Sequence, residues 1–212
     1  MAFATIDVTK GITGTLPTTN LPTIPVTKGG TGLTSGTTDQ FLKFTGTTTV
    51  ASAAVSAGIS MANQWRLTSD FTGDATPITS NLEAIDTYGP GSIGTAMTVS
   101  SGVFTFPSTG IYFIQAQGEF YYGGDSRYNQ LIIEITTDNN NFNEAAKSTA
   151  GIAQAESSTT HGNSSSFYLF DVTDVSTHKV RFTSSVSNNS VTTYGNTGRN
   201  QTCMTFIRLG DT

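Results

Sequence analysis

From Gln64 to the C-terminus, apolar and polar residues follow the two-residue period of β-strands, interrupted by turns. Because successive side chains of a strand point to opposite faces, this pattern predicts an all-β domain. A Pro-Ser-Thr-Gly turn follows the first expected strand, Asp138–Asn143 is expected to form a turn or hairpin loop, and residues 185–198 a long polar loop. The expected strands cover residues 103–106, 111–122, 130–137, 165–172, 178–184 and 202–209. Six or more strands without a convincing helix indicate a β-sandwich, of which a jelly roll is one arrangement.

The strand expected over 111–122 is apolar on both faces. Tyr112 and Ile114 lie on one face, and Ile111 and Phe113 lie on the other. A monomeric sandwich needs only one apolar face, so the second face requires a partner, and a trimer axis would cover it. Replacing Phe113 or Ile133 with Asp is expected to collapse the domain, because an unpaired buried charge costs several kcal/mol.

Residues 1–60 follow a different pattern, with three Leu-Pro or Ile-Pro steps before a Lys-Gly-Gly-Thr-Gly run at 28–32. Proline removes a backbone donor and pushes the preceding residue to extended geometry, which excludes helix here. The apolar side chains are too sparse for one chain to bury, whereas three chains wound round a common axis could bury them. The residues expected at such an axis are Leu16, Leu21, Ile24, Val26 and Leu33. A flexible linker is the alternative interpretation.

The junction between the two patterns is less defined. Residues 41–44 predict a short strand followed by a turn, and residues 51–62 fit either a short helix or a tight strand. We place the domain boundary near Met61–Asn63, which gives a stalk over 16–62 and a head over 63–212.

Composition narrows the function. The net charge is −5, and the ten Lys and Arg residues are scattered, so nucleic acid is not an expected partner. No apolar run approaches the roughly 20 residues that cross a bilayer, so membrane insertion is not expected. The N-terminus has neither the basic stretch nor the apolar core of a secretion signal, which predicts that the protein is made in the host cytoplasm and reaches the outside of a cell only by a route other than the usual export. The single cysteine, Cys203, is expected to be a buried thiol in a strand.

Candidate catalytic and metal chemistry is sparse. The two histidines and one cysteine lack zinc-ligand spacing, and no Gly-x-Ser-x-Gly motif is present, so no metal, cofactor or catalytic residue is predicted. His161 is expected in a solvated polar loop. Carboxylate pairs that could suit polysaccharide cleavage, Asp70 with Asp74 and Asp138 with Glu144, flank expected turns.

A binding surface is the better prediction. Aromatic, Arg and Asp residues gather in two glycine-containing segments, 121–129 and 190–200, and Tyr and Arg are enriched at binding hot spots. The candidate receptor-binding residues are Tyr122, Asp125, Arg127, Tyr128, Tyr194 and Arg199. Packing within a trimer is the alternative role for Tyr121 and Tyr122, and simple exposure to solvent is the alternative for the others.

Two stretches resemble known families. Leu21-Pro22, the Gly-Gly-Thr-Gly run and the Phe41-Leu42-Lys43-Phe44-Thr45-Gly46-Thr47 segment together resemble the recurrent stalk element of phage tail fibres. Gly102-Val103-Phe104-Thr105-Phe106-Pro107 followed by Gly110-Ile111-Tyr112-Phe113 is similar to the head of the C1q and tumour-necrosis-factor families. The segments 131–137, 167–172, 179–182 and 205–209 follow in the family's order. Asp171-Val172-Thr173-Asp174 departs from the family's aliphatic-x-x-Gly-Asp turn.

The resemblances imply a ten-stranded jelly-roll head that trimerises, carried on an intertwined stalk, with no enzyme activity. The expected function is a homotrimeric structural fibre on the outside of a bacteriophage virion, tail or capsid. Residues 1–15, with Phe3, Ile6 and Val8, would anchor it to another virion protein, and the knob would contact a host-surface glycan or outer-membrane component. A capsid-decorating or head-vertex fibre without a specific receptor is the first alternative, and a polysaccharide depolymerase is the second.

Overall fold

The computed structural model describes residues 36–38, 40–47, 49–54, 58–89 and 91–212. The chain divides into two compact units, Met1–Ser56 and Ala57–Thr212. The predicted anchor residues Phe3, Ile6 and Val8 and the predicted stalk residues Leu16, Leu21, Ile24, Val26 and Leu33 lie outside the described residues. The division into anchor, stalk and head therefore stays a prediction.

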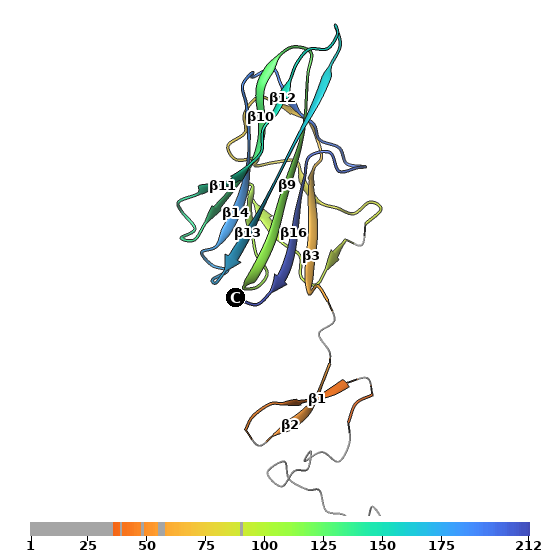
Figure 1. Ribbon diagram of the computed structural model, residues 1–212, viewed down its shortest axis with the longest axis vertical. Helices are drawn as coiled ribbons and strands as arrows, with labels where there is room; N and C mark the ends of the chain where they lie inside the picture. Colours follow the sequence, from red (N-terminus) through yellow and green to blue (C-terminus); the bar gives the residue numbers. More distant parts are fainter. Residues whose placement is uncertain (1–35, 39, 48, 55–57, 90) are drawn as a thin grey trace, which may run out of the picture. The chain divides into compact units, whose positions relative to one another are not determined.

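Every regular element in the described residues is a β-strand (Figure 1). The first unit contains β1 (Gln40–Phe44) and β2 (Val50–Ala54). The second unit contains β3 (Met61–Leu67), β4 (Phe71–Thr72), β5 (Leu82–Ala84), β6 (Ser92–Ile93), β7 (Thr98–Ser100), β8 (Val103–Thr105) and β9 (Gly110–Tyr122). It continues with β10 (Ser126–Thr136), β11 (Asn143–Lys147), β12 (Ala150–Ile152), β13 (Thr160–Val172), β14 (Lys179–Val186), β15 (Thr192–Thr193) and β16 (Cys203–Gly210).

The strands of the second unit form two antiparallel sheets. The first sheet has the order β11-β10-β14-β8-β7, with β12 also paired to β10. The second has the order β4-β15-β9-β16-β3-β5, with β13 on the other side of β9 and β6 paired to β3. Long connections join strands that are far apart in sequence, since β16 lies between β9 and β3. This arrangement of two antiparallel sheets confirms the predicted β-sandwich.

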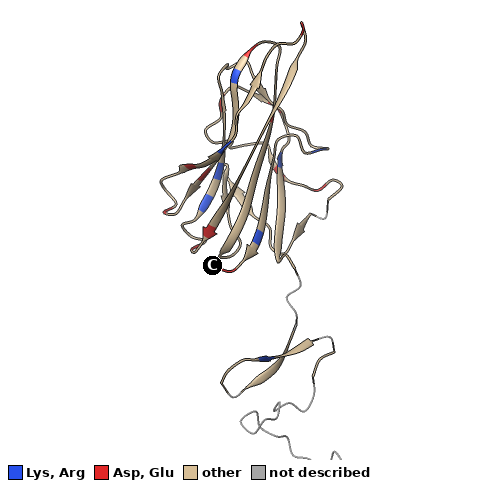
Figure 2. Cartoon of the chain, viewed as in Figure 1, with Lys and Arg blue, Asp and Glu red and all other residues tan. Residues whose placement is uncertain are grey.

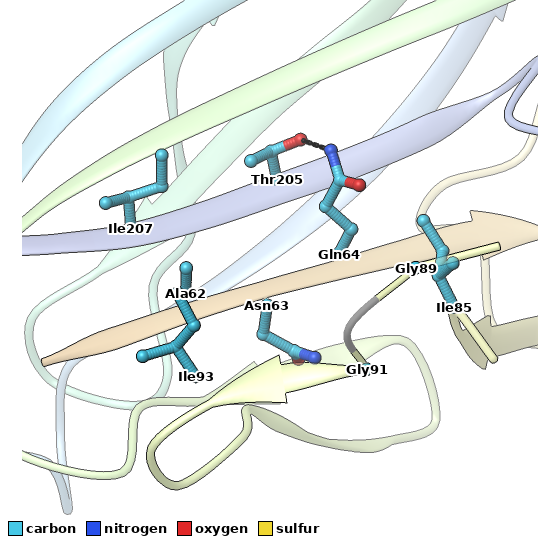
Figure 3. A pocket seen from close by; sticks show the side chains of 9 residues that line it. All are labelled: Ala62, Asn63, Gln64, Ile85, Gly89, Gly91, Ile93, Thr205 and Ile207. Carbon is cyan, nitrogen blue, oxygen red and sulfur yellow. Dashed lines mark hydrogen bonds between the residues drawn. The ribbon is translucent and has the colours of Figure 1, made fainter. Parts of the chain in front are cut away.

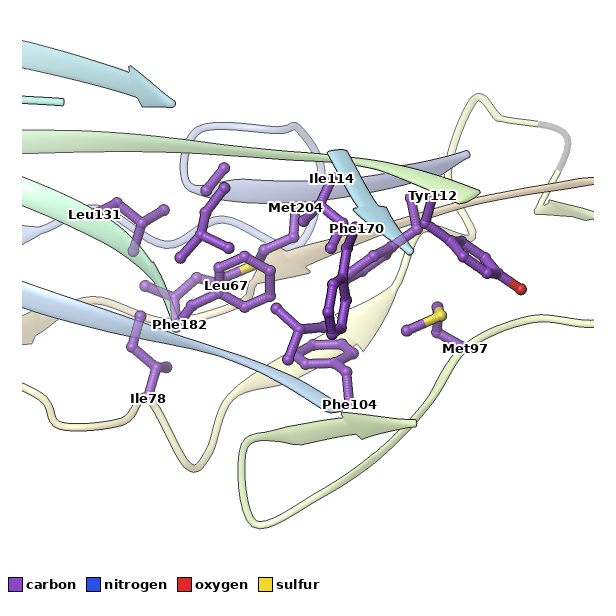
Figure 4. Close-up of a cluster of buried hydrophobic side chains, with 14 of the residues drawn as sticks. Leu67, Ile78, Met97, Phe104, Tyr112, Ile114, Leu131, Phe170, Phe182 and Met204 are labelled. Atoms are coloured by element: carbon purple, nitrogen blue, oxygen red, sulfur yellow. The ribbon is translucent and has the colours of Figure 1, made fainter. Parts of the chain in front are cut away.

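The two sheets enclose one hydrophobic core, part of which is drawn in Figure 4. Phe104 lies near its centre, with its ring centroid 5.5 Å from that of Phe182 and 5.3 Å from that of Phe206. Trp65 packs edge-on against Phe104 at 5.4 Å. These rings come from both sheets, so the aromatic residues of the expected strands hold the two layers together.

The β9–β13 pair is the longest ladder, with thirteen consecutive partners from Gly110↔Val172 to Tyr122↔Thr160. The buried side of β13 is partly polar, because Ser164 and Ser166 face the core. Ser164 Oγ accepts the backbone N–H of Leu131 at 3.2 Å, and Ser166 Oγ donates to the Leu131 carbonyl at 3.4 Å. These bonds satisfy the buried hydroxyls and tie β13 to β10 of the other sheet.

Several local expectations are confirmed and others are corrected. The segment after β10 is the expected hairpin loop, and Asp138 Oδ1 accepts the N–H groups of Asn140 and Asn141 within it. The segment at 51–62, left open between helix and strand, contains β2 and the start of β3. The expected polar loop at 185–198 contains the short strand β15, and His161 lies in β13 and not in a loop.

In the first unit, β1 and β2 form an antiparallel hairpin, which confirms the strand and turn predicted at 41–47. Phe41, Leu42 and Phe44 of β1 are all exposed within the described residues. A two-stranded hairpin is marginal in water without a further layer. Those apolar side chains therefore call for a covering partner.

Candidate functional site

The side of the second sheet that faces away from the core carries an ordered set of side chains, which we call the outer face. Strand register places Leu169 (β13) beside Phe113 (β9), Phe113 beside Ile207 (β16), Ile207 beside Ala62 (β3) and Ala62 beside Ile93 (β6). Directly paired residues share a face and lie about 5 Å apart. These five residues, the apolar row, therefore cross the sheet as a continuous band of roughly 20 Å.

The apolar row is partly open to solvent in the single chain, since Leu169 and Ile93 are exposed and its other members are half-buried. Phe167 is 69% exposed and Leu169 58%, and both lie on β13. The Phe167 ring stacks on Phe113 with centroids 6.1 Å apart. Large apolar side chains that gather on one face mark an interaction surface, whereas isolated ones do not.

The far edge of the same band is hollowed by a cavity of about 200 Å³, the edge pocket. Figure 3 shows Ala62, Ile207 and Ile93 around it, with Ile85 and the backbone of Gly89 and Gly91 on the other side. Few polar side chains line the edge pocket. Two of them bond to each other, since Gln64 Nε2 donates to Thr205 Oγ1 at 2.9 Å. Phe167 and Leu169 protrude from β13, and the edge pocket lies on the β3 side of the sheet, beyond β9 and β16.

The middle of the outer face is polar and almost uncharged. Ser165, Gln117, Cys203 and Arg66 lie in one row across four strands. Arg66 is the exception in charge, but its guanidinium is buried and binds Glu83 at 2.7 Å and Asp86 at 2.8 Å. Figure 2 shows how few charged residues lie along the central strands of this sheet.

The opposite end of the outer face carries an aromatic cluster of Tyr121, His161 and Tyr194. Tyr121 and His161 are direct partners across β9 and β13, with ring centroids 5.5 Å apart. Tyr194 follows β15 and stands edge-on to Tyr121, at 5.5 Å and an interplanar angle of 82°. The three rings, with Asp70 and Thr159, line an open cavity of about 280 Å³.

Two carboxylates hold this cluster in place. Asp70 Oδ2 accepts the Tyr121 hydroxyl at 2.8 Å, and Asp70 Oδ1 accepts the Gly195 N–H at 2.8 Å. Glu119 Oε1 lies 3.0 Å from His161 Nδ1. The hydrogen bond to the Asp70 carboxylate, followed by burial, raises the pKa of Tyr121, which therefore stays a neutral donor at physiological pH.

The backbone behind Tyr194 is equally fixed. Its N–H donates to the Glu119 carbonyl at 2.8 Å, and the Asn196 N–H donates to the Leu67 carbonyl at 2.8 Å. Gly195 packs so closely against Ser69 that an added Cβ would collide with the Ser69 backbone. The cluster is thus mounted on strands and a tied loop, which gives its rings defined positions.

The structure places the predicted receptor-binding residues in different surroundings. Tyr194 belongs to the aromatic cluster, together with Tyr121, for which packing was the alternative to binding, and His161, which was expected to be solvated. Tyr122 accepts a hydrogen bond from Asn188 Nδ2 at 3.2 Å, and Asp125 accepts the Gln154 N–H at 2.8 Å. The remaining predicted residues, Arg127, Tyr128 and Arg199, are exposed.

The carboxylates weighed for sugar cleavage support backbone or neighbouring side chains. Asp74 Oδ1 accepts the Val186 N–H at 2.7 Å, Asp138 closes the β10–β11 loop, and Glu144 pairs with Lys147 at 2.8 Å. Within the described residues, no three His, Cys, Asp or Glu side chains are grouped as a metal site. The part of the chain that the structure describes also has no helix long and apolar enough to cross a membrane.

No protein-family model and no curated protein matches this sequence. Solved structures do share its fold. Mouse APRIL, in its crystal structure at pH 5.0, has a TM-score of 0.51 and 9% identity, over 70% of this chain and 98% of that one. The Eiger TNF of S. frugiperda has a TM-score of 0.50 and 11% identity, over 73% of this chain and 96% of that one. The head therefore has a tumour-necrosis-factor-like jelly-roll fold.

Proposed function

We propose that this chain is a non-enzymatic fibre protein on the exterior of a bacteriophage virion, that it assembles as a homotrimer, and that its jelly-roll head contacts the host cell surface. The observation that carries the proposal is the exposed apolar row, with Phe167 and Leu169 protruding from β13 and the edge pocket on the far side of the sheet.

These two features complement each other. A copy that offers Phe167 and Leu169 can fill the edge pocket of a second copy, whose own β13 stays free for a third. Such a head-to-tail contact closes into a ring when the rotation between copies fits. The trimer implied by the resemblance to C1q and tumour-necrosis-factor heads is the ring that we propose. It would remove the apolar row from water, which is the dominant favourable contribution to association.

The first unit supports the same assembly. Phe41, Leu42 and Phe44 are exposed on the β1–β2 hairpin, and the preceding prolines and Gly-Gly-Thr-Gly run resemble a phage tail-fibre stalk. Three hairpins that share their apolar side chains would cover what one hairpin leaves in water. Placement on a virion rests on this stalk resemblance, with residues 1–15 as the proposed anchor.

Sedimentation of the full-length protein at micromolar concentration tests the assembly. We expect a trimer, and we expect Phe167→Asp to shift it to monomers because three desolvated charges would meet the edge pockets. Tyr128→Asp is the matched control, since it places the same charge on an exposed aromatic position of the other sheet. A wild-type protein that sediments as a folded monomer contradicts the proposal.

The biological role needs separate measurements. Gold-labelled antibody against the chain should bind purified virions in electron micrographs, and purified head should compete with phage adsorption to host cells. Labelling of capsids without competition would favour the decorating fibre. Release of reducing sugar from host envelope would favour the depolymerase.

A further inference from the structure

We propose that the cavity lined by the aromatic cluster binds a single neutral sugar ring of a glycan, and does not bind an acidic sugar. This inference rests on the proposed function, since it specifies what the head would recognise at the host surface. Its basis is the arrangement of three rings and two oriented carboxylates around one open cavity.

The rings provide surfaces that face different directions. Tyr121 and His161 lie side by side with an interplanar angle of 35°, and Tyr194 stands at 82° to Tyr121 and 51° to His161. A pyranose has a flat apolar C–H face and a rim of hydroxyls. Its apolar face can pack on one ring while its edge rests against the next. Tyrosine suits this role because it offers a rigid apolar surface with a polar tip at low entropic cost.

The polar groups at the cavity are mostly acceptors. Asp70 has already oriented both oxygens toward Tyr121 and Gly195, and each oxygen retains a second lone pair. When ionised, Glu119 can only accept, so the ring tautomer of His161 that matches it carries its proton on Nδ1 and leaves Nε2 as an acceptor. Sugar hydroxyls are donors that match this set, and the hydroxyls of Thr159 and Tyr194 can serve as either donor or acceptor.

Charge selects among sugars. No Lys or Arg is among the five residues that line the cavity, whereas Asp70 is, and Glu119 lies directly behind His161. A carboxylate-bearing sugar would bring a further negative charge close to the carboxylates of Asp70 and Glu119, in a cavity whose described lining holds no Lys or Arg. The electrostatic cost of that approach favours neutral sugars over uronic and sialic acids.

The cavity is separate from the proposed trimer contact. Both lie on the outer face, but His161 and Phe167 are six residues apart on β13, which corresponds to roughly 20 Å along a strand. Substitutions in the aromatic cluster should therefore leave the assembly unchanged.

Saturation-transfer NMR on the full-length protein tests the site. The probes are the methyl glycosides of glucose, galactose, mannose and N-acetylglucosamine, with those of glucuronic acid and N-acetylneuraminic acid as the acidic set. We expect at least one neutral probe to bind, and we expect every acidic probe to bind less tightly than that neutral probe. Tyr194→Ala should lower the affinity for the neutral probe by roughly fivefold or more, as truncation of a binding aromatic residue does. Tyr194→Phe should lower this affinity less, because it keeps the ring.

Tyr88→Ala, which removes a fully exposed tyrosine that does not line the cavity, is the matched control and should bind as the wild type does. Three results would overturn the site: no neutral probe binds, an acidic probe binds more tightly, or Tyr194→Ala binds as well as Tyr88→Ala. The trimer and the virion label are measured independently, so their persistence alongside any of these results would refute the sugar site alone. Loss of the trimer or of the virion label would refute the proposed fibre instead.

Discussion

The two ends of the outer face are built on the same strands, yet they have opposite chemistry. At one end, Leu169, Phe113 and Ile207 form an apolar band whose side chains cannot hydrogen-bond to water. At the other end, Tyr121 and His161 occupy the equivalent paired positions of β9 and β13, and each is hydrogen-bonded to a carboxylate. The first end suits permanent burial against another copy of the chain. The second end keeps polar groups that a small ligand can satisfy, so the proposed assembly and the proposed recognition would use different ends of one sheet.

The largest expected effect is on folding, and it distinguishes the core from the apolar row. Ile133→Asp should unfold the head, because Ile133 is fully buried and an unpaired charge there costs on the order of 5 kcal/mol. Leu169→Asp should keep the fold and lose the trimer. Circular dichroism melting and sedimentation of both variants measure this difference. A folded Ile133→Asp protein would contradict the core assignment, and an unfolded Leu169→Asp protein would contradict the placement of that residue on the outer face.

The polar middle of the outer face gives the next effect. Burial raises the pKa of the Cys203 thiol from its usual value near 9 to about 11. The folded state therefore favours the protonated thiol. The resulting contribution to the free energy of unfolding is present below about pH 9 and is lost as pH rises through about 11. It amounts to about 2–3 kcal/mol. Urea denaturation of wild type and Cys203→Ala between these pH values should converge, and parallel curves would contradict the burial of the thiol.

At the aromatic end, Gly195→Ala should cost about 1–2 kcal/mol, because the added methyl group pushes the loop from Ser69 and strains the hydrogen bond to Asp70. The same variant should bind the neutral sugar probe less well, since Tyr194 moves with the loop. Gly123→Ala is the matched control, because an added Cβ there meets no atom within 4 Å. Equal stability of the two variants in urea denaturation would show that the loop tolerates displacement.

The smallest effect concerns the edge pocket. Ile93→Lys places a charge at its rim, where the side chain is 44% exposed in the single chain. We expect the trimer to weaken by about 1 kcal/mol per contact, because a long cation can keep its charge in solvent. Mass photometry of a dilution series measures the dissociation of the trimer, and Tyr128→Lys is the control. An unchanged midpoint would exclude Ile93 from the contact.

The sequence predicted the strands that are rich in apolar side chains. Residues 111–122 carry such side chains on both faces, and they form β9 as expected. Phe113 and Ile133 were expected to be equivalent, but Ile133 is in the core while Phe113 lies on the outer face. Alternation shows which residues share a face of a strand, but it cannot show which face meets the second sheet.

The aromatic cluster could not be predicted in the same way. Its members are 40 and 33 residues apart along the chain, so only the pairing of β9, β13 and β15 brings them together. The segment around His161 resembled a loop because the residues that alternate with it toward the core are Gly162, Ser164 and Ser166. The Ser164 and Ser166 hydroxyls bond to the backbone of Leu131, a tertiary interaction without a sequence signal. The one available hint was the two-residue spacing of His161, Asn163, Ser165 and Phe167, which places them on one face of a strand.

The uninterrupted β9–β13 ladder has a consequence for how such a protein can diversify. Residues separated by more than about 10 Å without common partners usually have additive effects on stability. New side chains at positions 121, 161 and 194 can therefore be tried by mutation without disturbing the subunit contacts that we propose at positions 113, 167 and 169. If both proposals hold, a lineage bearing this scaffold could change what it recognises while conserving how it assembles.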